Sequence, residues 1–146
     1  MCRSRHLDDA FDGEGARRYG GRWNSPGTRM VYTADSAALA TLEILVNLEQ
    51  TALLAAYNFV PADLDEEFIE DLGNDEMPDD WRQAPPSEST QRIGDEWIES
   101  ESSVGLRVPS SVVPGENILL NPDHSHFREI EVQEPMDWDA DPRLLP

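Results

Sequence analysis

The sequence predicts an α+β fold in which a small mixed or antiparallel sheet is flanked by helices. A short β-type run at residues 30–33 leads directly into the clearest helical pattern, residues 35–49. A second helical pattern, at residues 90–100, is followed by several β-type runs with no further helix between them. Strands that follow one another in this way favour α+β over the regular alternation of a parallel α/β fold.

The first half of the chain is expected to contain a loop, a strand and a helix. Residues 1–29 are rich in glycine and arginine and are predicted to form loops. The helix over residues 35–49 has Asp35 or Ser36 as its N-cap, and good helix formers follow. Apolar side chains recur at helical spacing, which predicts one buried face. That face comprises Leu39, Leu42, Leu45 and Val46, with Glu49 at its end.

The rest of the chain is expected to supply most of the strands. Residues 53–61 read as a strand that ends at Pro61. Residues 62–89 are acidic and proline-rich, and we expect a surface excursion there with one or two short helices. The remaining predicted elements are the helix over 90–100, strands over 104–109, 117–122 and 127–132, and an edge segment or frayed tail over 133–146.

Length and composition fit a single domain over residues 1–146, which is long enough to bury a core. Cys2 is the one cysteine, which excludes an intramolecular disulfide and a cysteine-based zinc site. The sequence has no apolar run of about 18 residues and no apolar leader, so we expect a cytoplasmic protein without a membrane span.

Net charge is the unusual property of this chain. Thirty acidic residues face eleven cations, all of them arginine, and the net charge is −19. Such a charge opposes binding to nucleic acid or to anionic membranes, because phosphate binding requires cations. It also destabilises the compact state by self-repulsion, which concentrated salt screens. We favour a halophilic cytoplasm, with arginine-for-lysine codon bias in a GC-rich genome as the alternative.

The stretch R-Y-G-G-R-W-N-S-P-G, residues 18–27, places a cation on a glycine-rich backbone between aromatic residues. Glycines allow the backbone to approach a ligand closely, and Arg22 there can grip a phosphate with two hydrogen bonds. Tyr19 and Trp23 offer flat faces for a ring. The alternative is a tight turn with a surface arginine and a packed tryptophan, which the local sequence alone favours. The stretch matches neither a P-loop nor a dinucleotide fingerprint.

Glu43 is a second candidate because it lies inside the apolar run L-E-I-L-V. A buried carboxylate needs a partner, and Arg22 is available for that role. A partly desolvated glutamate is also a candidate acid, base or acceptor for ribose hydroxyls. From the local sequence alone we expect a solvated side chain.

Two further groups of polar residues lie near the C-terminal end of the chain. Ser110 and Ser111 follow a predicted strand, where turn chemistry is the ordinary explanation. His124 and His126 could suggest a metal or an acid–base pair, but two histidines without a third ligand are a weak zinc signal. We therefore expect loop histidines and no metal site.

Three stretches in order resemble the RES domain, a family named for its Arg, Glu and Ser. RES proteins are toxins of RES–Xre toxin–antitoxin pairs. The resemblance covers about residues 9–132, the core of the single domain, and leaves residues 133–146 as an acidic C-terminal segment. The three stretches are G-E-G-A-R-R-Y-G-G-R-W-N-S-P-G-T (13–28), V-Y-T-A-D-S-A-A-L-A-T-L-E-I-L-V (31–46) and L-R-V-P-S-S-V-V-P-G-E-N-I-L-L-N-P (106–122).

The resemblance implies a fold like that of ADP-ribosyltransferases, with NAD bound in a cleft as a substrate rather than as a cofactor. It implies cleavage of the nicotinamide–ribose bond, with transfer of ADP-ribose to inorganic phosphate or water, or in other members to a protein. It further implies an Xre-type antitoxin that plugs the cleft, and a homodimer within the toxin–antitoxin complex.

The resemblance also implies a set of site residues. The family's Arg, Glu and Ser correspond to Arg22, Glu43 and Ser110, with Ser111 as a less favoured register, and Tyr32 matches its active-site tyrosine. Arg22 would hold phosphate, Tyr32 would stack on nicotinamide, Glu43 would stabilise the cationic ribose, and Ser110 would bind the nicotinamide amide or ribose. The expected NAD contacts are Tyr19, Gly21, Arg22, Trp23, Asn24, Tyr32 and Ser110, with Arg17, Arg18 and Arg29 adding positive charge.

One departure from the family pattern lies at the N-terminus. Family members begin with a strand that carries an aromatic–Arg–Ile stretch, and this strand is expected to be missing or cut short in M-C-R-S-R-H.

The leading function that the resemblance implies is an NAD-consuming toxin, with a mono-ADP-ribosyltransferase as the first alternative. A truncated, non-catalytic module that binds the antitoxin is the second alternative, and a ribonuclease toxin is a distant third.

We predict that the melting temperature rises between low salt and molar KCl. Salt shortens the Debye length to roughly 3 Å at 1 M and so screens the self-repulsion of an acidic chain. Thermal denaturation followed by circular dichroism across a KCl series tests this. A melting temperature that stays level or falls would contradict the halophilic interpretation.

Overall fold

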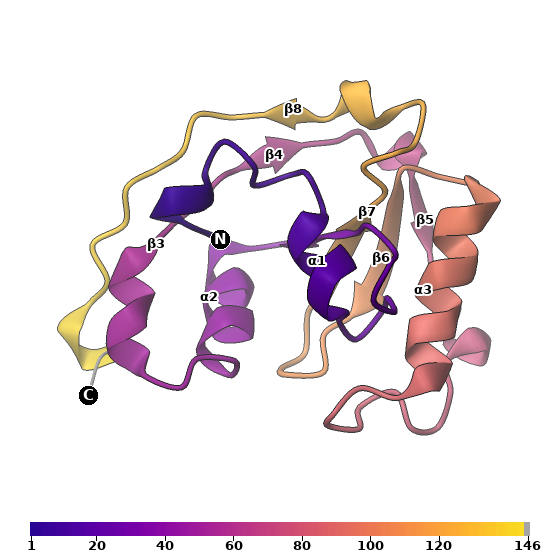
Figure 1. Cartoon of the computed structure of the whole chain (residues 1–146), viewed down its shortest axis with the longest axis horizontal. Helices are drawn as coiled ribbons and strands as arrows, with labels where there is room; N and C mark the ends of the chain where they lie inside the picture. Colours follow the sequence, from indigo (N-terminus) through magenta and orange to yellow (C-terminus); the bar gives the residue numbers. More distant parts are fainter. Residues whose placement is uncertain (145–146) are drawn as a thin grey trace.

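A four-stranded mixed sheet forms the centre of the molecule (Figure 1). The computed structural model describes residues 1–144. The strands are ordered β2 (Val31–Ala34), β7 (Glu116–Leu120), β6 (Gly105–Pro109) and β5 (Ile69–Asp71). β7 pairs antiparallel with both β2 and β6, whereas β5 runs parallel to β6. The predicted α+β class with a small mixed sheet is confirmed.

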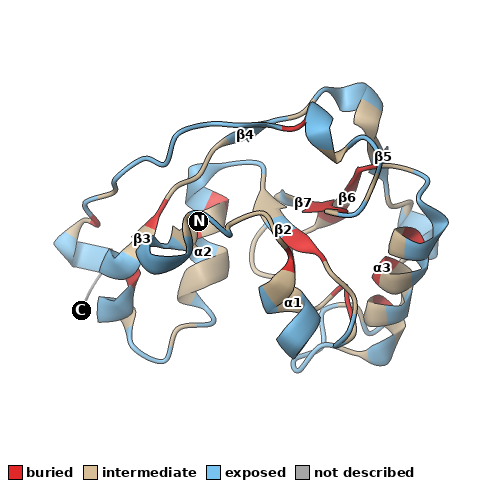
Figure 2. Cartoon of the chain, turned by 45° about the horizontal axis from the view of Figure 1, so that its top comes forward, coloured by how far each residue is buried: buried red, intermediate tan, exposed pale blue. Residues whose placement is uncertain are grey.

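Within residues 1–144, three α-helices accompany the sheet: α1 (Glu14–Tyr19), α2 (Ala37–Leu45) and α3 (Glu88–Ser100). The sheet lies between α2 and α3, which stand on opposite sides of it in both views (Figures 1 and 2). The predicted cap of α2 is Ser36, whose hydroxyl accepts a hydrogen bond of 3.2 Å from the Leu39 N–H. No helix among residues 1–144 has the length and apolar character needed to cross a bilayer.

Two short ribbons lie outside the main sheet. β1 (Cys2–Arg3) pairs with β3 (Tyr57–Asn58), and β4 (Ala62–Asp63) pairs with β8 (Glu131–Val132). An N-terminal strand, expected to be missing or cut short, is therefore present as the two residues of β1. The connections include 3₁₀ helices at Ser4–His6, Thr51–Ala56, Glu66–Phe68, Asn74–Glu76, Phe127–Glu129 and Pro142–Leu144.

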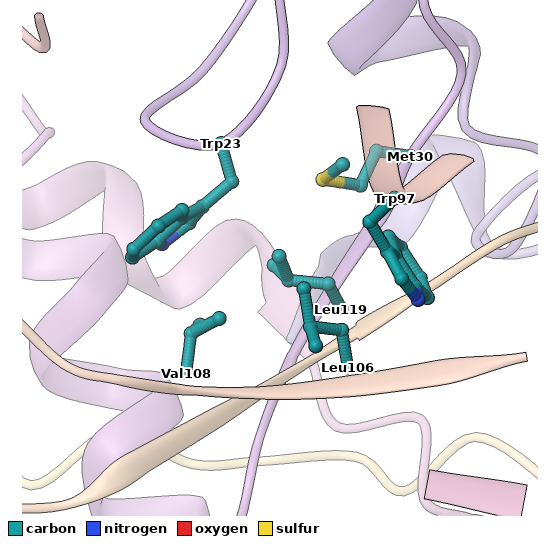
Figure 3. Packing of buried hydrophobic residues seen from close by; sticks show 6 residues of the cluster. All are labelled: Trp23, Met30, Trp97, Leu106, Val108 and Leu119. Atoms are coloured by element: carbon teal, nitrogen blue, oxygen red, sulfur yellow. The ribbon is translucent and has the colours of Figure 1, made fainter. Parts of the chain in front are cut away.

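The sheet buries apolar side chains on both of its faces. Alternation along β7 sends Leu119 to one face and Leu120 to the other, which explains why the run I-L-L is continuously apolar. The first face packs on α3 and on the loop before β2 through Trp23, Met30, Trp97, Leu106, Val108 and Leu119 (Figure 3). The second face carries Val31 and Leu120, which cluster with Val104 and Ile130.

The structure corrects several predicted elements. The strand expected over 53–61 is a 3₁₀ helix over Thr51–Ala56, and only Tyr57–Asn58 pairs as a strand. The strand expected over 127–132 begins with a 3₁₀ helix and pairs only at its end. Helix α1 occupies part of the predicted N-terminal loop, and β5 lies in the predicted surface excursion. The helix formers in T-A-L-L-A-A explain the 3₁₀ helix over Thr51–Ala56. β5 was not predicted because it forms by pairing with β6, which is remote in the sequence.

The predicted buried face of α2 is also largely wrong. Leu39 is buried, but Leu42 is 36% exposed and Val46 is 59% exposed. The helix ends at Leu45, so Val46 lies at its cap rather than inside it.

Helix α3 holds the loop that contains Arg22. Gln91 Nε2 donates to the Gly21 carbonyl at 3.0 Å, and Asp95 Oδ1 accepts from the Ser25 N–H at 3.0 Å. Between them, Gly94 lies directly against the backbone carbonyl of Trp23, where a Cβ atom would overlap. Gly94 is therefore required for the close approach of helix and loop.

We predict that Gly94→Ala destabilises the protein by about 3 kcal/mol, the upper range for overpacking, because the methyl group meets backbone rather than a mobile side chain. Gly15→Ala in α1 is the matched control. A Cβ there meets nothing within 4 Å, and alanine should stabilise the helix by up to ~1 kcal/mol. Urea denaturation measures both changes, and equal midpoints for the two variants would refute the close approach.

Candidate active site

The candidate active site is organised around the Glu43 carboxylate in the last turn of α2. Its Oε1 accepts two hydrogen bonds, from Ser110 Oγ at 2.8 Å and from Asn117 Nδ2 at 2.6 Å. The negative end of a helix dipole disfavours a carboxylate at this position, and these donors offset that effect. The expectation of a freely solvated Glu43 is wrong, because the residue is half-buried and bonded on one oxygen.

The β6–β7 hairpin brings both donors to Glu43. Val108 pairs with Asn117 across the two strands, and Ser110 follows β6 on the same face as Val108. The Ser110 N–H donates to the Gly115 carbonyl at 2.9 Å, and the Ser110 hydroxyl accepts from the Val112 N–H at 3.0 Å. The serine bonded to Glu43 is thus Ser110 and not Ser111.

A second part of the site is the loop that carries Arg22. Gly20 has φ of +70°, and the Gly21 N–H donates to the Asn24 carbonyl at 2.9 Å. The fully buried Asn24 closes this turn, because its amide donates to the carbonyls of Ala16, Ser25 and Thr28 at 2.9–3.1 Å.

Tyr32 joins this loop to the sheet. Its hydroxyl donates to Asn24 Oδ1 at 2.8 Å and accepts from the Trp23 N–H at 3.0 Å. A Cβ at Gly21 would lie 2.5 Å from that hydroxyl, so the loop closes on it only with glycine. Enclosure of the hydroxyl raises the pKa of Tyr32 above its ordinary value, although 40% of the residue surface remains exposed. The polar tip is thus buried while part of the ring faces solvent.

Arg22 keeps its charge available. Its Nη1 donates to the carbonyls of Trp81 at 2.6 Å and Gln83 at 3.0 Å. Within residues 1–144, no carboxylate forms an ion pair with Arg22, so it is not the partner of Glu43. Neutral carbonyl partners leave the charge uncancelled for an anionic ligand.

The arginines predicted to add positive charge around Arg22 form ion pairs with acidic side chains. Arg17, Arg18 and Arg29 all pair with the Glu14 carboxylate, and Arg29 also pairs with Asp123. The hydrogen bond from Arg17 is the main reason that the pKa of Glu14 falls to about 2. Two carboxylates face these three arginines, so their positive charge is only partly cancelled, and its role in ligand binding stays a prediction.

Three residues expected to contact NAD occupy different environments. Trp23 is 2% exposed and belongs to the core cluster on one face of the sheet (Figure 3). Asn24 is wholly buried, and Tyr19 is 83% exposed at the end of α1. The geometry of Trp23 and Asn24 supports a role in building the Arg22 loop, and a ligand contact by Tyr19 remains a prediction.

Sequence reasoning missed Asn117, although a signal was present. An asparagine inside the apolar strand E-N-I-L-L must either reach solvent or find a buried partner. The carbonyls of Trp81 and Gln83 were also missed, because backbone acceptors leave no signature in the sequence.

No group of three or more metal-ligating side chains is present in the described part of the chain. His124 and His126 bond locally instead, since the His126 N–H donates to His124 Nδ1 at 3.0 Å. A cavity of about 560 Å³ is lined by Tyr32 and by Ala37 and Ala40 of α2, together with residues such as Phe11 and Trp138. Neither Glu43 nor its two donors line it, so the site is assigned by its chemistry and not by cavity size.

The arrangement suits a particular kind of ligand. A fixed carboxylate stabilises a carbon centre that becomes cationic, and an uncancelled guanidinium binds a phosphate. Tyr32 has part of its ring exposed, and its hydroxyl bonds to the Trp23 N–H, next to Arg22 in the chain.

Comparison with known proteins gives a consistent result. A family model described as the RES domain matches residues 1–143. The sequence is 40% identical over 147 residues to Toxin Res of Photorhabdus laumondii, covering 99% of this chain and 94% of that protein. It is 34% identical over 143 residues to the Prs ADP-ribosylating toxin of a Sphingobium species, covering 94% of this chain and 88% of that protein.

A third relative is known both as a sequence and as a structure. The NAD(+) phosphorylase MbcT of Mycobacterium tuberculosis is 34% identical over 96 residues, covering 61% of this chain and 50% of that protein. A chain in the crystal structure of the M. tuberculosis MbcT–MbcA toxin–antitoxin complex superposes with a TM-score of 0.72 at 24% identity. The superposition covers 91% of this chain and 78% of that chain, and it shows the shared fold.

We predict that Tyr32 ionises above the ordinary tyrosine pKa of 10.0. The folded state favours the neutral phenol, so this contribution to stability is complete below that pH and is lost as pH rises through the folded-state pKa. Phenolate absorbance, recorded while circular dichroism shows the protein folded, should contain a late step that Tyr32→Phe removes. Tyr19→Phe is the control for an exposed ring, and alkaline titrations of identical shape for wild type and Tyr32→Phe would contradict the assignment.

Proposed function

The chain belongs to the RES domain family, and on that premise we propose that it is the toxin of a toxin–antitoxin pair that consumes NAD by cleaving the nicotinamide–ribose bond. The names of its relatives support this, since they include toxins, an NAD(+) phosphorylase and an ADP-ribosylating toxin. The observation that carries the proposal is the Glu43 carboxylate, which two donors fix on one oxygen. Within residues 1–144 no donor bonds to its Oε2.

Glu43 is suited to the bond-breaking step. When the bond between ribose and the pyridinium nitrogen breaks, the electron pair leaves with neutral nicotinamide and the ribose carbon becomes cationic. A carboxylate held in place before reaction stabilises that charge without reorganisation. Oε2 is the oxygen that faces the ribose in this proposal, while Ser110 and Asn117 keep Oε1 occupied.

Arg22 and Tyr32 account for the rest of the substrate. The pyrophosphate of NAD is anionic, and Arg22 offers a guanidinium whose charge no described carboxylate cancels. The exposed part of the Tyr32 ring offers a flat surface for nicotinamide. NAD is a substrate in this scheme, and no resident cofactor or metal is required.

The acceptor of ADP-ribose is inorganic phosphate in the leading form of the proposal. A phosphate oxygen bonds to the ribose carbon, its proton passes to solvent, and the product is ADP-ribose-1″-phosphate. Water as the acceptor gives ADP-ribose instead. A protein acceptor is the second candidate, favoured by the similarity to the Prs ADP-ribosylating toxin.

The proposed partner is an Xre-type antitoxin that covers the Glu43 site, with the toxin a homodimer in that complex. The similarity to a chain of a toxin–antitoxin complex supports an antitoxin partner in general. A net charge of −19 argues against nucleic acid binding by the toxin itself, and NAD as substrate favours the cytoplasm.

We expect purified protein to release nicotinamide from NAD in molar KCl, and Glu43→Gln to slow release by roughly 100-fold or more, because the fixed charge is lost at constant shape. Glu49→Gln is the matched control, an exposed glutamate just beyond the same helix. Chromatography of the products with and without phosphate identifies the acceptor.

Each outcome of this assay decides between the alternatives. Release that depends on phosphate supports phosphorolysis, and release without phosphate supports hydrolysis. Release that appears only with added cell extract, together with a labelled protein, supports protein modification. Absence of release under all three conditions would overturn catalysis and leave a module that binds the antitoxin.

A further inference from the structure

Asn117 occupies the candidate site in a defined orientation. A carboxylate only accepts hydrogen bonds, so the side-chain nitrogen of Asn117 must face Glu43 Oε1, and it does so at 2.6 Å. The carbonyl oxygen, Oδ1, therefore points away from Glu43. The bond to Glu43 fixes which end of the amide is which.

Asn117 Oδ1 lacks a partner. It is a fully buried side-chain oxygen with no hydrogen bond to any described residue, and it is the one such atom found among residues 1–144. A buried acceptor without a donor is costly, and native proteins rarely retain one without a function. Oδ1 lies two bonds from Nδ2, the atom that donates to Glu43. This position points to a ligand as the source of the missing donor.

The sheet register places Asn117 beside the other site residues. Asn117 lies opposite Ala34, and Leu119 lies opposite Tyr32, so Asn117 and Tyr32 are diagonal neighbours on one face. The residue facing Asn117 is thus an alanine, whose methyl group fills little space. β7 lies between β2, which carries Tyr32, and β6, which leads to Ser110.

We infer that Asn117 contacts the substrate directly, holding Glu43 through Nδ2 while Oδ1 accepts a hydrogen bond from NAD. This inference rests on the proposed function. Two groups near the scissile bond can donate, namely the carboxamide N–H of nicotinamide and a hydroxyl of the attached ribose. In either case one side chain aligns the substrate with the carboxylate that stabilises its transition state.

The inference predicts a specific kind of selectivity. A site built to accept a substrate hydrogen bond rejects an analogue that lacks the donor, because the buried acceptor is then left unpaired. Replacing the Asn117 side chain should therefore lower activity on NAD. It should also abolish the discrimination against the analogue that lacks the group donating to Oδ1. A residue that only positions Glu43 would lower activity on all substrates equally.

The test compares kcat/KM for NAD and two analogues in wild type and Asn117→Ala. One analogue is 3-acetylpyridine adenine dinucleotide, in which a methyl group replaces the carboxamide nitrogen. The other lacks the 2-hydroxyl of the nicotinamide ribose. Taking the ratio of wild type to variant for each substrate cancels the intrinsic reactivity of the leaving groups. Val108→Ala, the cross-strand neighbour of Asn117, controls for lost packing, and melting temperatures report folding.

The preference is kcat/KM for NAD divided by kcat/KM for an analogue. For one of the analogues we expect this preference to be at least about tenfold larger in wild type than in Asn117→Ala, which is the effect of losing one hydrogen bond. Loss of preference against the acetylpyridine analogue identifies the carboxamide as the donor, and loss against the deoxy analogue identifies the ribose. Val108→Ala should lower the melting temperature and keep both preferences. Preferences that agree within about threefold between wild type and Asn117→Ala for both analogues would overturn the inference while leaving NAD cleavage intact.

A failure of the proposed function has a different signature. If wild type cleaves none of the three dinucleotides, calorimetry measures the Kd of each one for wild type and for Asn117→Ala, and the ratios of these Kd values replace the ratios of kcat/KM. A preference in binding that Asn117→Ala abolishes would still support the contact. Absence of NAD binding would overturn the inference together with the proposed function.

Discussion

The pair of hydrogen bonds onto Glu43 Oε1 is the interaction on which the site depends. A half-buried carboxylate at the C-terminal end of a helix is unfavourable alone, and donors from the two sides of the β6–β7 turn offset that. A slip of one residue between β6 and β7 would place Ser110 and Asn117 on opposite faces of the sheet. Apolar clusters on both faces of the sheet oppose such a slip, so the core fixes the geometry of the site.

The second constraint is the supply of positive charge in an acidic chain. Three arginines share the Glu14 carboxylate, whereas Arg22 is held by backbone carbonyls. That difference depends on a loop with little freedom. Its turn is closed by Asn24 and the Tyr32 hydroxyl, and α3 holds it from the other side through Gln91 and Asp95. Trp23 anchors the loop in the core beside Arg22, so packing and ligand binding use adjacent residues.

Local features of the sequence predicted much of this fold. The Ser36 cap, the strand at Val31–Ala34 and the helix ending at Ser100 follow from short-range signals. The site residues Arg22, Tyr32, Glu43 and Ser110 were identified by resemblance, and the structure brings Ser110 onto Glu43. Features that depend on remote partners were not predictable: the parallel pairing of β5, the bond from Asn117, and the burial of Trp23 and Asn24. Each is decided by tertiary packing rather than by neighbours in the chain.

The strand order has a consequence for synthesis on the ribosome. β2 is the first strand of the main sheet in the sequence, and its partner β7 is the last. Ser110 and Asn117 are 67 and 74 residues away from Glu43 in the chain. Because such non-local contacts close late in folding, a nascent chain exposes Glu43 long before either donor has emerged. The site is therefore completed only when nearly the whole polypeptide has been made, and a prematurely terminated chain carries its glutamate without the groups that orient it.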